Sequence, residues 1–371
     1  MNAQNLLDYF MLIPDPRAKR TRDHELPQLL FIALAAILSG ADGWTQVEQF
    51  GKASRAWLET FLDLPNGIPS HDTFGRVFAA LDPNALETAL RAFVRDFAGE
   101  SAGKHIAIDG KTLRHSFDRA AEKSAIHMVA AWVCENHTAF GQVKVDDKSN
   151  EITAIPQLLG MLNLNDATVT IDAMGCQKEI AKQIVDGGAD YVLALKGNQG
   201  TLHEEVKEFF TDVFADRLDA ELEHCQSIEK NHGRIEERRV WVSREVGWLR
   251  DVDKWQRLSS LVAVQSKCTR DGQTATECRY YICSGHKSAK ELGKIIRNHW
   301  HIENELHWTL DVVFDEDLCR VRKDNAAENL SRMRHIALSL LKQDKSAKVG
   351  IQGRRLKAAW DKKYLLHLLR L

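Results

Sequence analysis

The chain has 371 residues, which is enough for two or three domains with a sizeable core. Apolar residues make up 44% of it and charged residues 27%, the proportions of a soluble globular protein. The net charge of −2 argues against a polyanion as partner for the chain as a whole. Residues 342–371, however, contain many Lys and Arg residues and only two acidic residues, Asp344 and Asp361. This basic tail points to a polyanion, with a solvated basic helix as the alternative.

The seven cysteines are scattered and include no CxxC pair, so neither a zinc ribbon nor a disulfide framework is indicated. Reduced thiols are expected. The first residues lack the basic and apolar regions of a secretory signal, and the apolar run at residues 29–38 is too short to span a bilayer. We therefore expect a cytoplasmic protein.

Residues up to about 95 predict helices. The apolar run at residues 29–38 predicts a buried helix, and apolar residues from Trp44 to Leu62 recur at helical spacing. Ser70 is a credible N-cap for a helix that ends near Asp82, and another helix follows over residues 84–97. With its basic arm at residues 17–22, this domain could contact DNA, act as a lid or mediate dimerisation. No recognition-helix pattern decides between these.

From Lys104 the pattern becomes strand-like. Residues 105–108 predict a β-strand that ends on a carboxylate, Asp109, before Gly110. Three cationic side chains follow: Lys111, Arg114 and His115. One acid among bases suits a metal ion and a polyanionic substrate at one place. The alternative is a strand that ends in an Asp-Gly turn with solvated bases.

The next elements again include a strand that ends on an aspartate. Strands are predicted over residues 127–136 and 138–146, a helix over 153–162, a strand over 168–171, a helix over 178–185 and a strand over 191–199. The 168–171 strand ends on a second acid, Asp172. Three adjacent strands followed by strand–helix–strand is the order of a ribonuclease-H-like sheet, in which the first and fourth strands are neighbours. Asp109 and Asp172 would then lie close enough to share metal ions, as two-metal phosphoryl transfer requires.

A β-rich insertion is predicted over about residues 202–286, where alternating residues flank an Asp271–Gly272 hairpin turn. The helix after it, residues 294–317, carries a second dense cluster. Spaced four apart, His299, Glu303 and His307 are expected to share one helical face, beside Trp300 and Trp308.

A carboxylate from this helix would complete an oxygen cage for Mg²⁺ or Mn²⁺. The alternative is an amphipathic helix with solvated acids. Composition does not choose among the nearby acids Glu303, Glu305, Asp311, Asp315 and Asp317. No HExxH motif occurs, which argues against a zinc protease, although the HxHxE run could hold zinc in another way.

In this order, the motifs resemble the H-repeat-associated (Rhs-linked) transposases of bacterial insertion sequences, a branch of the DDE superfamily with a ribonuclease-H-like core. The resemblance covers nearly the whole chain. It rests on HDTFGRVFAALD, AIDGKTLRHS, KSNEITAIPQLL, TIDAMGCQK, ADYVLALKGNQ, NHG at residues 231–233, RNHWHIENELHWTLDVVFDED and NAAENLSRMRHIAL.

The resemblance implies an α/β fold: a ribonuclease-H-like mixed sheet with flanking helices and a β-rich insertion before the Glu-bearing helix. It implies an all-helical transposase-associated domain over residues 1–98 and a DDE catalytic domain over residues 102–371. It further implies metal-dependent cleavage at transposon ends and strand transfer into target DNA. The catalytic and metal-binding residues would be Asp109, Asp172 and Glu303, holding two Mg²⁺ or Mn²⁺ ions. Double-stranded DNA would be the partner, with a homodimer on DNA and association with the nucleoid.

Side chains near the strand ends and on the helix could bind DNA. They are Lys111, Arg114, Lys178, Lys196, Asn198, Gln199, His299 and His307, and the tail bases Arg354, Arg355, Lys357, Lys362 and Lys363 would add sequence-independent affinity. Solvated or capping side chains are the alternative. Related families carry an Arg where His299 stands and a Lys where Leu310 stands, so the phosphate ligand is open. A nuclease without strand transfer and a domesticated or inactive DNA-binding protein remain alternative functions.

Overall fold

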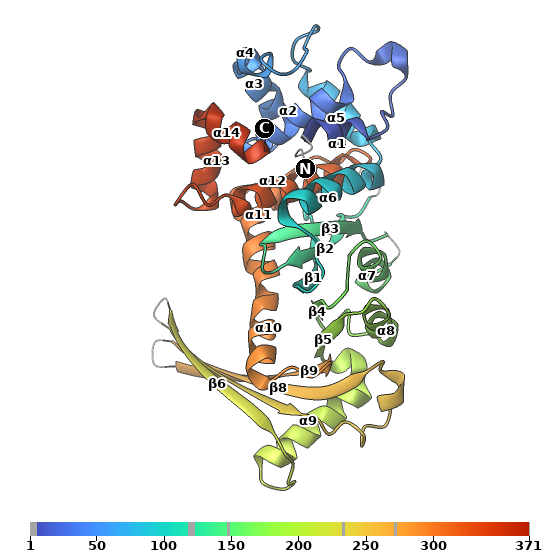
Figure 1. The fold of residues 1–371 in the computed structure, drawn as a ribbon, viewed down its shortest axis with the longest axis vertical. Coiled ribbons are helices and arrows are strands. Elements are labelled where there is room, and N and C mark those ends of the chain that lie inside the picture. The colour runs from blue at the N-terminus through green and yellow to red at the C-terminus, as the bar shows by residue number, and fades with distance from the viewer. Residues whose placement is uncertain (1–5, 118–122, 147–148, 232–233, 271–272, 371) are drawn as a thin grey trace. The chain divides into compact units, whose positions relative to one another are not determined.

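A computed structural model describes residues 6–117, 123–146, 149–231, 234–270 and 273–370 (Figure 1). The chain forms two compact units. Unit 1 comprises residues 1–100, 110–148 and 303–371, and unit 2 comprises residues 101–109 and 149–302. The domain boundaries predicted from the sequence, at residues 98 and 102, stay a prediction.

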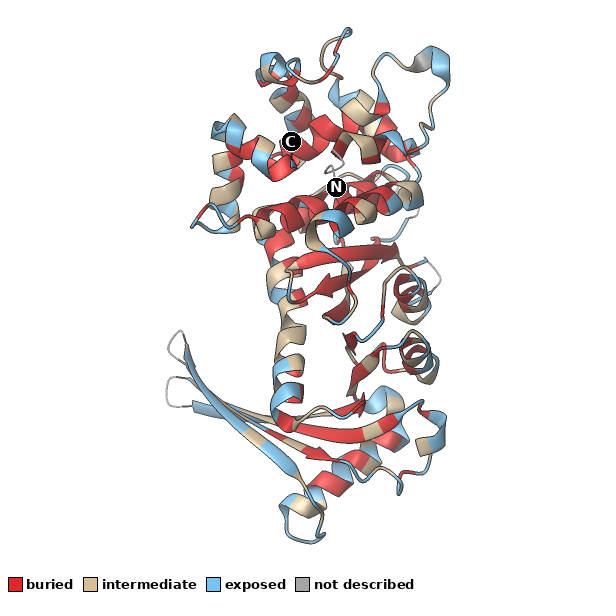
Figure 2. Ribbon diagram, in the orientation of Figure 1, coloured by how far each residue is buried: buried red, intermediate tan, exposed pale blue. Residues whose placement is uncertain are grey.

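The N-terminal part of unit 1 is helical, as the sequence predicts. Its elements are α1 (Leu6–Met11), the 3-10 turn η1 (Lys19–Thr21), α2 (Leu26–Leu38), α3 (Trp44–Ala53), α4 (Arg55–Leu58), α5 (His71–Ala80) and α6 (Pro83–Ala98). The apolar run in α2 is buried from Leu29 to Leu38 (Figure 2). At the start of α5 the Ser70 hydroxyl accepts a hydrogen bond from the Thr73 N–H, which confirms the predicted cap.

Unit 1 continues with a hairpin of two strands, β2 (His127–Val133) and β3 (Thr138–Lys144), which pair antiparallel. The C-terminal elements are α11 (Trp308–Val313), the 3-10 turn η5 (Glu316–Leu318), α12 (Ala326–Gln343), α13 (Ile351–Trp360) and α14 (Lys362–Leu369). Buried from Ala326 to Leu341, α12 packs against β3, α2, α5 and α6 and forms the centre of the unit (Figure 2).

The predicted basic tail is folded rather than extended. Arg355 in α13 is 2% exposed, and its guanidinium donates to Asp42 Oδ1 at 2.8 Å and to the Ile37 carbonyl at 3.1 Å. The Lys362 ammonium lies over the rings of Phe50 and Trp57. The DNA contact inferred for Arg355 is therefore wrong, because its guanidinium is buried within unit 1 and pairs there with Asp42.

The sheet of unit 2 has the strand order β1-β4-β5-β9-β8-β7-β6, and the order continues beyond β1 with β2 and then β3. Its strands are β1 (His105–Thr112), β4 (Thr168–Ile171), β5 (Asp190–Leu195), β6 (Glu223–Asn231), β7 (Arg234–Ser243), β8 (Leu258–Arg270) and β9 (Gln273–Ser284). β4 pairs parallel with both β1 and β5. β9 pairs antiparallel with β5 and β8, and β7 pairs antiparallel with β8 and β6. The fold is therefore a ribonuclease-H-like mixed α/β fold, and its first and fourth strands are neighbours as predicted.

The helices of unit 2 are α7 (Glu151–Leu159), α8 (Lys178–Asp186), α9 (Gly200–Phe214) and α10 (Ala289–His301), with 3-10 turns η2 (Gly197–Gln199) and η3 (Val252–Lys254). The predicted insertion adds β6 to β9, and β9 pairs with β5. The Asp271–Gly272 turn and His232 and Gly233 of the NHG motif lie outside the described residues. The strands on either side of that turn pair as far as Arg270 and Gln273.

Several elements differ in their bounds from the predictions, and three of these differences involve the predicted site residues. β1 does not end at Asp109 but continues to Thr112, so the alternative of an Asp-Gly turn is wrong. β5 ends at Leu195, and residues 197–199 form η2 instead of strand. The predicted helix over residues 294–317 is interrupted by a π-helix, η4 (Ile302–His307), between α10 and α11.

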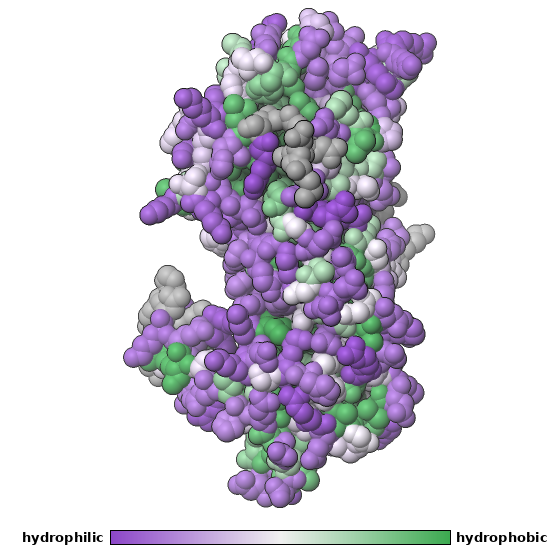
Figure 3. Space-filling view, viewed as in Figure 1, coloured by the Kyte–Doolittle hydropathy of each residue, from purple (hydrophilic) through white to green (hydrophobic). Residues whose placement is uncertain are grey.

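Within the described ranges, no helix is both long and apolar enough to cross a membrane. The face drawn in Figure 3 is largely hydrophilic, with apolar patches scattered over it.

Candidate active site

Asp109 and Asp172 follow the last residue pair between β1 and β4. Ile108 pairs with Ile171 in the parallel register, and each is followed directly by its aspartate. Adjacent strands lie about 4.8 Å apart, and residues in register point to the same face. The two carboxylates therefore lie side by side, each directly after the paired part of its strand. Both residues are half-buried.

The surroundings of Asp172 disfavour its negative charge. Burial raises the pKa of the Asp172 carboxyl, and repulsion from Glu151 and Asp109 raises it further. Two backbone N–H groups act in the opposite direction: Met174 N donates to Asp172 Oδ1 at 3.0 Å and Gly175 N at 3.4 Å. A divalent cation would relieve the repulsion between these carboxylates, and carboxylate oxygens are the ligands that Mg²⁺ and Mn²⁺ prefer. The residues present therefore fit such an ion.

Glu151 is the acidic neighbour that the sequence analysis did not single out. It is the first residue of α7, which the Asn150 side chain caps by accepting from the Ile152 N–H. Ile155, one helical turn after Glu151, approaches the loop behind Asp172: its Cδ1 would lie 2.9 Å from a Cβ at Gly175. The motif KSNEITAIPQLL contains Glu151, so its place in that motif was the available signal.

His299 contacts the sheet beside Asp172. Its Nδ1 lies 2.9 Å from Thr170 Oγ1, which also lies 2.8 Å from His105 Nε2. Burial lowers the pKa of His105 to about 3, so this imidazole is neutral at pH 7. His299 is thus linked to β4 two residues before Asp172.

Glu303 lies in the π-helix η4 and is exposed. A π-helix bonds residue i to residue i+5, so the α-helical spacing used to place His299, Glu303 and His307 on one face does not hold across this segment. Single π-turns within helices are frequent at functional sites.

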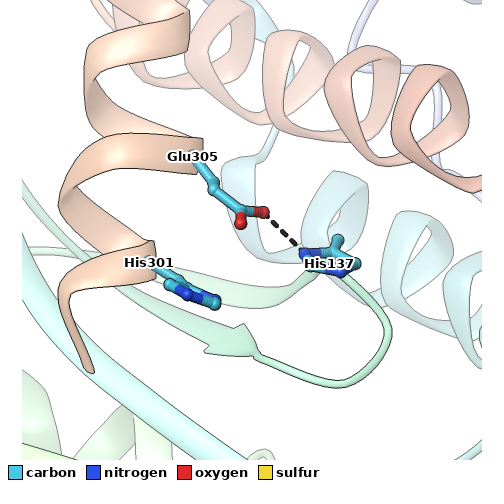
Figure 4. Close-up of side chains that lie close together, drawn as sticks. All are labelled: His137, His301 and Glu305. Carbon is cyan, nitrogen blue, oxygen red and sulfur yellow. Dashed lines mark hydrogen bonds and ion pairs between the residues drawn. The ribbon is translucent and has the colours of Figure 1, made fainter. Parts of the chain in front are cut away.

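Three acids near Glu303 already have cationic partners within unit 1. The Glu305 carboxylate lies 2.6 Å from His137 Nδ1 (Figure 4). It also lies 2.9 Å from Lys342 Nζ. Burial opposes its charge, but these two contacts hold the pKa of Glu305 at about 2. Asp311 pairs with Lys111, and Asp317 lies 3.3 Å from Arg114 Nε. These pairings argue against Glu305, Asp311 and Asp317 as the third metal ligand.

The other predicted DNA-binding residues have different surroundings. Lys111 is 11% exposed and pairs with Asp311 and Glu316, so a phosphate contact would require those pairs to open. Arg114 is 78% exposed. The Lys178 ammonium lies 3.3 Å from Asp251, Lys196 is exposed and His307 is half-buried. The side-chain amides of Asn198 and Gln199 donate to the backbone behind Asp172.

A ribonuclease-H-like sheet in which Asp109 and Asp172 directly follow the last paired residues of the first and fourth strands is the arrangement of the DDE transposases, and the chain belongs to this family. The model of the transposase DDE domain matches residues 100–340, and the model of the DDE_Tnp_1-associated domain matches residues 7–94.

Two relatives of Escherichia coli illustrate the similarity. The H repeat-associated putative transposase YhhI of strain K12 is 40% identical over 100% of this chain and 98% of its own length. The putative transposase YncI of O157:H7 is 42% identical over 100% of this chain and 95% of its own. Among solved structures, a piggyBac transposase synaptic complex with hairpin DNA matches 98% of this chain and 78% of its own, with a TM-score of 0.47 and 10% identity.

Proposed function

We propose that this transposase cuts DNA at the ends of its insertion sequence and transfers the freed ends into target DNA. The observation that carries the proposal is the register of β1 and β4, which brings Asp109 and Asp172 out side by side. Membership of the DDE family supports the same reaction class.

The proposed metal ligands are Asp109, Asp172 and Glu303. Two bound Mg²⁺ or Mn²⁺ ions would supply charge neutralisation for in-line attack on a phosphodiester and for the leaving oxygen. The role of the carboxylates is to bind and orient the ions. Neighbouring strands fix the spacing of Asp109 and Asp172, and two N–H groups of the following loop hold Asp172 Oδ1.

Double-stranded DNA is the proposed partner, bound as a homodimer that holds two transposon ends in the nucleoid. Three predicted phosphate ligands, Arg114, Lys178 and Lys196, are partly or well exposed and therefore accessible to a phosphate backbone. Such contacts would make DNA affinity fall with increasing salt.

The proposal is tested by Mg²⁺- and Mn²⁺-dependent cleavage of a labelled duplex that carries the element's own end. We expect Glu303→Gln and Asp109→Asn to abolish cleavage while DNA binding persists. Glu305→Gln is the matched control, because Glu305 belongs to the same π-helix but is bound to His137 and Lys342. Full cleavage by Glu303→Gln with loss in Glu305→Gln would assign the third ligand to Glu305.

A strand-transfer assay separates the proposal from its alternatives. Incubation of a pre-cut transposon end with supercoiled target DNA should give covalently joined products. Cleavage without joining would indicate a metal-dependent nuclease. Binding without either reaction would indicate a domesticated or inactive DNA-binding protein.

A further inference from the structure

The loop that connects Asp172 to α8 is held by two consecutive amide side chains from η2. Asn198 Nδ2 donates to the Ala173 carbonyl at 2.5 Å, and Gln199 Nε2 donates to the Cys176 carbonyl at 2.9 Å. Gln199 Nε2 also lies 3.3 Å from Gln177 Oε1. The chain from residue 173 to residue 177 is thus fixed near both ends by η2.

The same loop orients the Asp172 carboxylate. The N–H groups of Met174 and Gly175 both donate to Asp172 Oδ1, so their direction depends on the backbone conformation between residues 173 and 176. The loop is also tightly packed at Gly175, where a Cβ would lie 2.3 Å from Ile171 Cγ2. Only glycine fits so close an approach. One face of the loop therefore rests on β4 and α7, while the carbonyls of Ala173 and Cys176 accept from η2.

We propose that Asn198 and Gln199 are positioning residues for Asp172, rather than the DNA contacts that the sequence predicts. The inference rests on the proposed metal site at Asp172 and names what holds it. A metal-ligating carboxylate must keep its orientation, and the groups that fix it are commonly as important as the ligands themselves. By fixing the loop backbone, the two amides fix the N–H groups that hold the carboxylate oxygen.

The test measures metal binding apart from catalysis. Asn198→Leu and Gln199→Met keep nearly the same side-chain volume but remove the amide donors. Isothermal titration of the full-length protein with Mn²⁺, without DNA, should show affinity about 10- to 100-fold lower than in the wild type, the usual effect of losing a group that orients a ligand.

Gln183→Met is the matched control. Gln183 Nε2 donates to the Pro156 carbonyl at 2.9 Å, the same kind of bond within the same unit, but it connects α8 to α7 and does not touch the loop. We expect its Mn²⁺ affinity to stay within about twofold of the wild type. A loss equal to that of the η2 variants would overturn the inference, because any weakening of unit 2 would then suffice.

DNA affinity without metal, measured by mobility shift, separates positioning from direct contact. The inference predicts nearly unchanged DNA affinity for both η2 variants. Weaker DNA binding with unchanged Mn²⁺ affinity would overturn it and restore the predicted DNA contact. Each variant is checked by circular dichroism, and because the two substitutions are independent, one misfolded variant leaves the other as the test.

Asp172→Asn in the same titration distinguishes failure of the inference from failure of the proposed function. If Asp172→Asn leaves Mn²⁺ affinity unchanged, the proposed metal site is wrong, and the positioning role falls with it. If Asp172→Asn weakens Mn²⁺ binding but neither η2 variant does, the metal site stands and the positioning role alone is wrong.

Discussion

Lys111 and Glu316 form an ion pair inside unit 1, with the ammonium 2.9 Å from the carboxylate and the side chains 11% and 1% exposed. Lys111 also pairs with Asp311, and the Arg334 guanidinium lies 3.9 Å from Glu316. Burial disfavours the charge of Glu316, but Lys111 and Arg334 hold its pKa at about 2. Ion pairs thus connect the end of β1 to η5 and α11.

Replacing Lys111 should destabilise the fold more than it weakens DNA binding. Lys111→Met leaves the buried Glu316 without its nearest cation, and removing one partner of a buried pair typically costs about 3–5 kcal/mol. Urea unfolding measures the loss. The control is Lys52→Met, whose pair with Glu48 involves a lysine that is 64% exposed and should cost less than about 1 kcal/mol. Unchanged stability with weaker DNA binding would instead support the phosphate contact predicted for Lys111.

Glu305 should stabilise unit 1 in a pH-dependent way. Its folded pKa of about 2 lies below the value of about 4.3 for an unfolded glutamate, so the ionised form is favoured by folding. This stabilisation is complete above about pH 5 and is lost as the pH falls toward 2. Relative to wild type, Glu305→Gln should lose about 1–3 kcal/mol of unfolding free energy at pH 7 and much less at pH 2.

Urea unfolding across this range is the measurement, with Glu59→Gln as control because the Arg55–Glu59 pair is exposed on both sides. A difference in unfolding free energy between Glu305→Gln and the wild type that stays the same at every pH would contradict the low pKa of Glu305.

Local patterns predicted the fold well because they depend on nearest neighbours. Ser70 caps α5, and the apolar residues before Asp109 and Asp172 pair in register between β1 and β4. The π-helix was not predicted, because residues spaced four apart are also compatible with an ordinary α-helix. The burial of Arg355 escaped it because charge composition does not reveal a tertiary partner such as Asp42. The proximity of Glu151 to Asp172 likewise depends on packing between elements.

Gly175 should tolerate no side chain. A Cβ would lie 2.3 Å from Ile171 Cγ2 and 2.9 Å from Ile155 Cδ1, so Gly175→Ala must displace the loop behind Asp172. We expect a loss of about 1–3 kcal/mol in unfolding free energy, the usual cost of overpacking, together with weaker Mn²⁺ binding. Gly247→Ala is the control, since nothing lies within 4 Å of its Cβ position. Equal stability of the two variants would mean that the loop moves freely.

Glu151 should set the ionisation of Asp172 in the metal-free protein. Repulsion from Glu151 contributes to the raised pKa of the Asp172 carboxyl, so Glu151→Gln should lower that pKa toward its ordinary value. The ionised Asp172 is disfavoured by folding, so the same change should raise the unfolding free energy at pH 7. The gain should vanish well below about pH 4, where Asp172 is protonated in both the folded and the unfolded protein. Carbon-13 NMR titration of the aspartate carboxyls follows the pKa directly. Glu179→Gln, an exposed acid in the first turn of α8, is the control and should leave it in place. An Asp172 pKa that does not move in Glu151→Gln would mean that burial and Asp109 raise it without Glu151, and Glu151 would then have no part in the site.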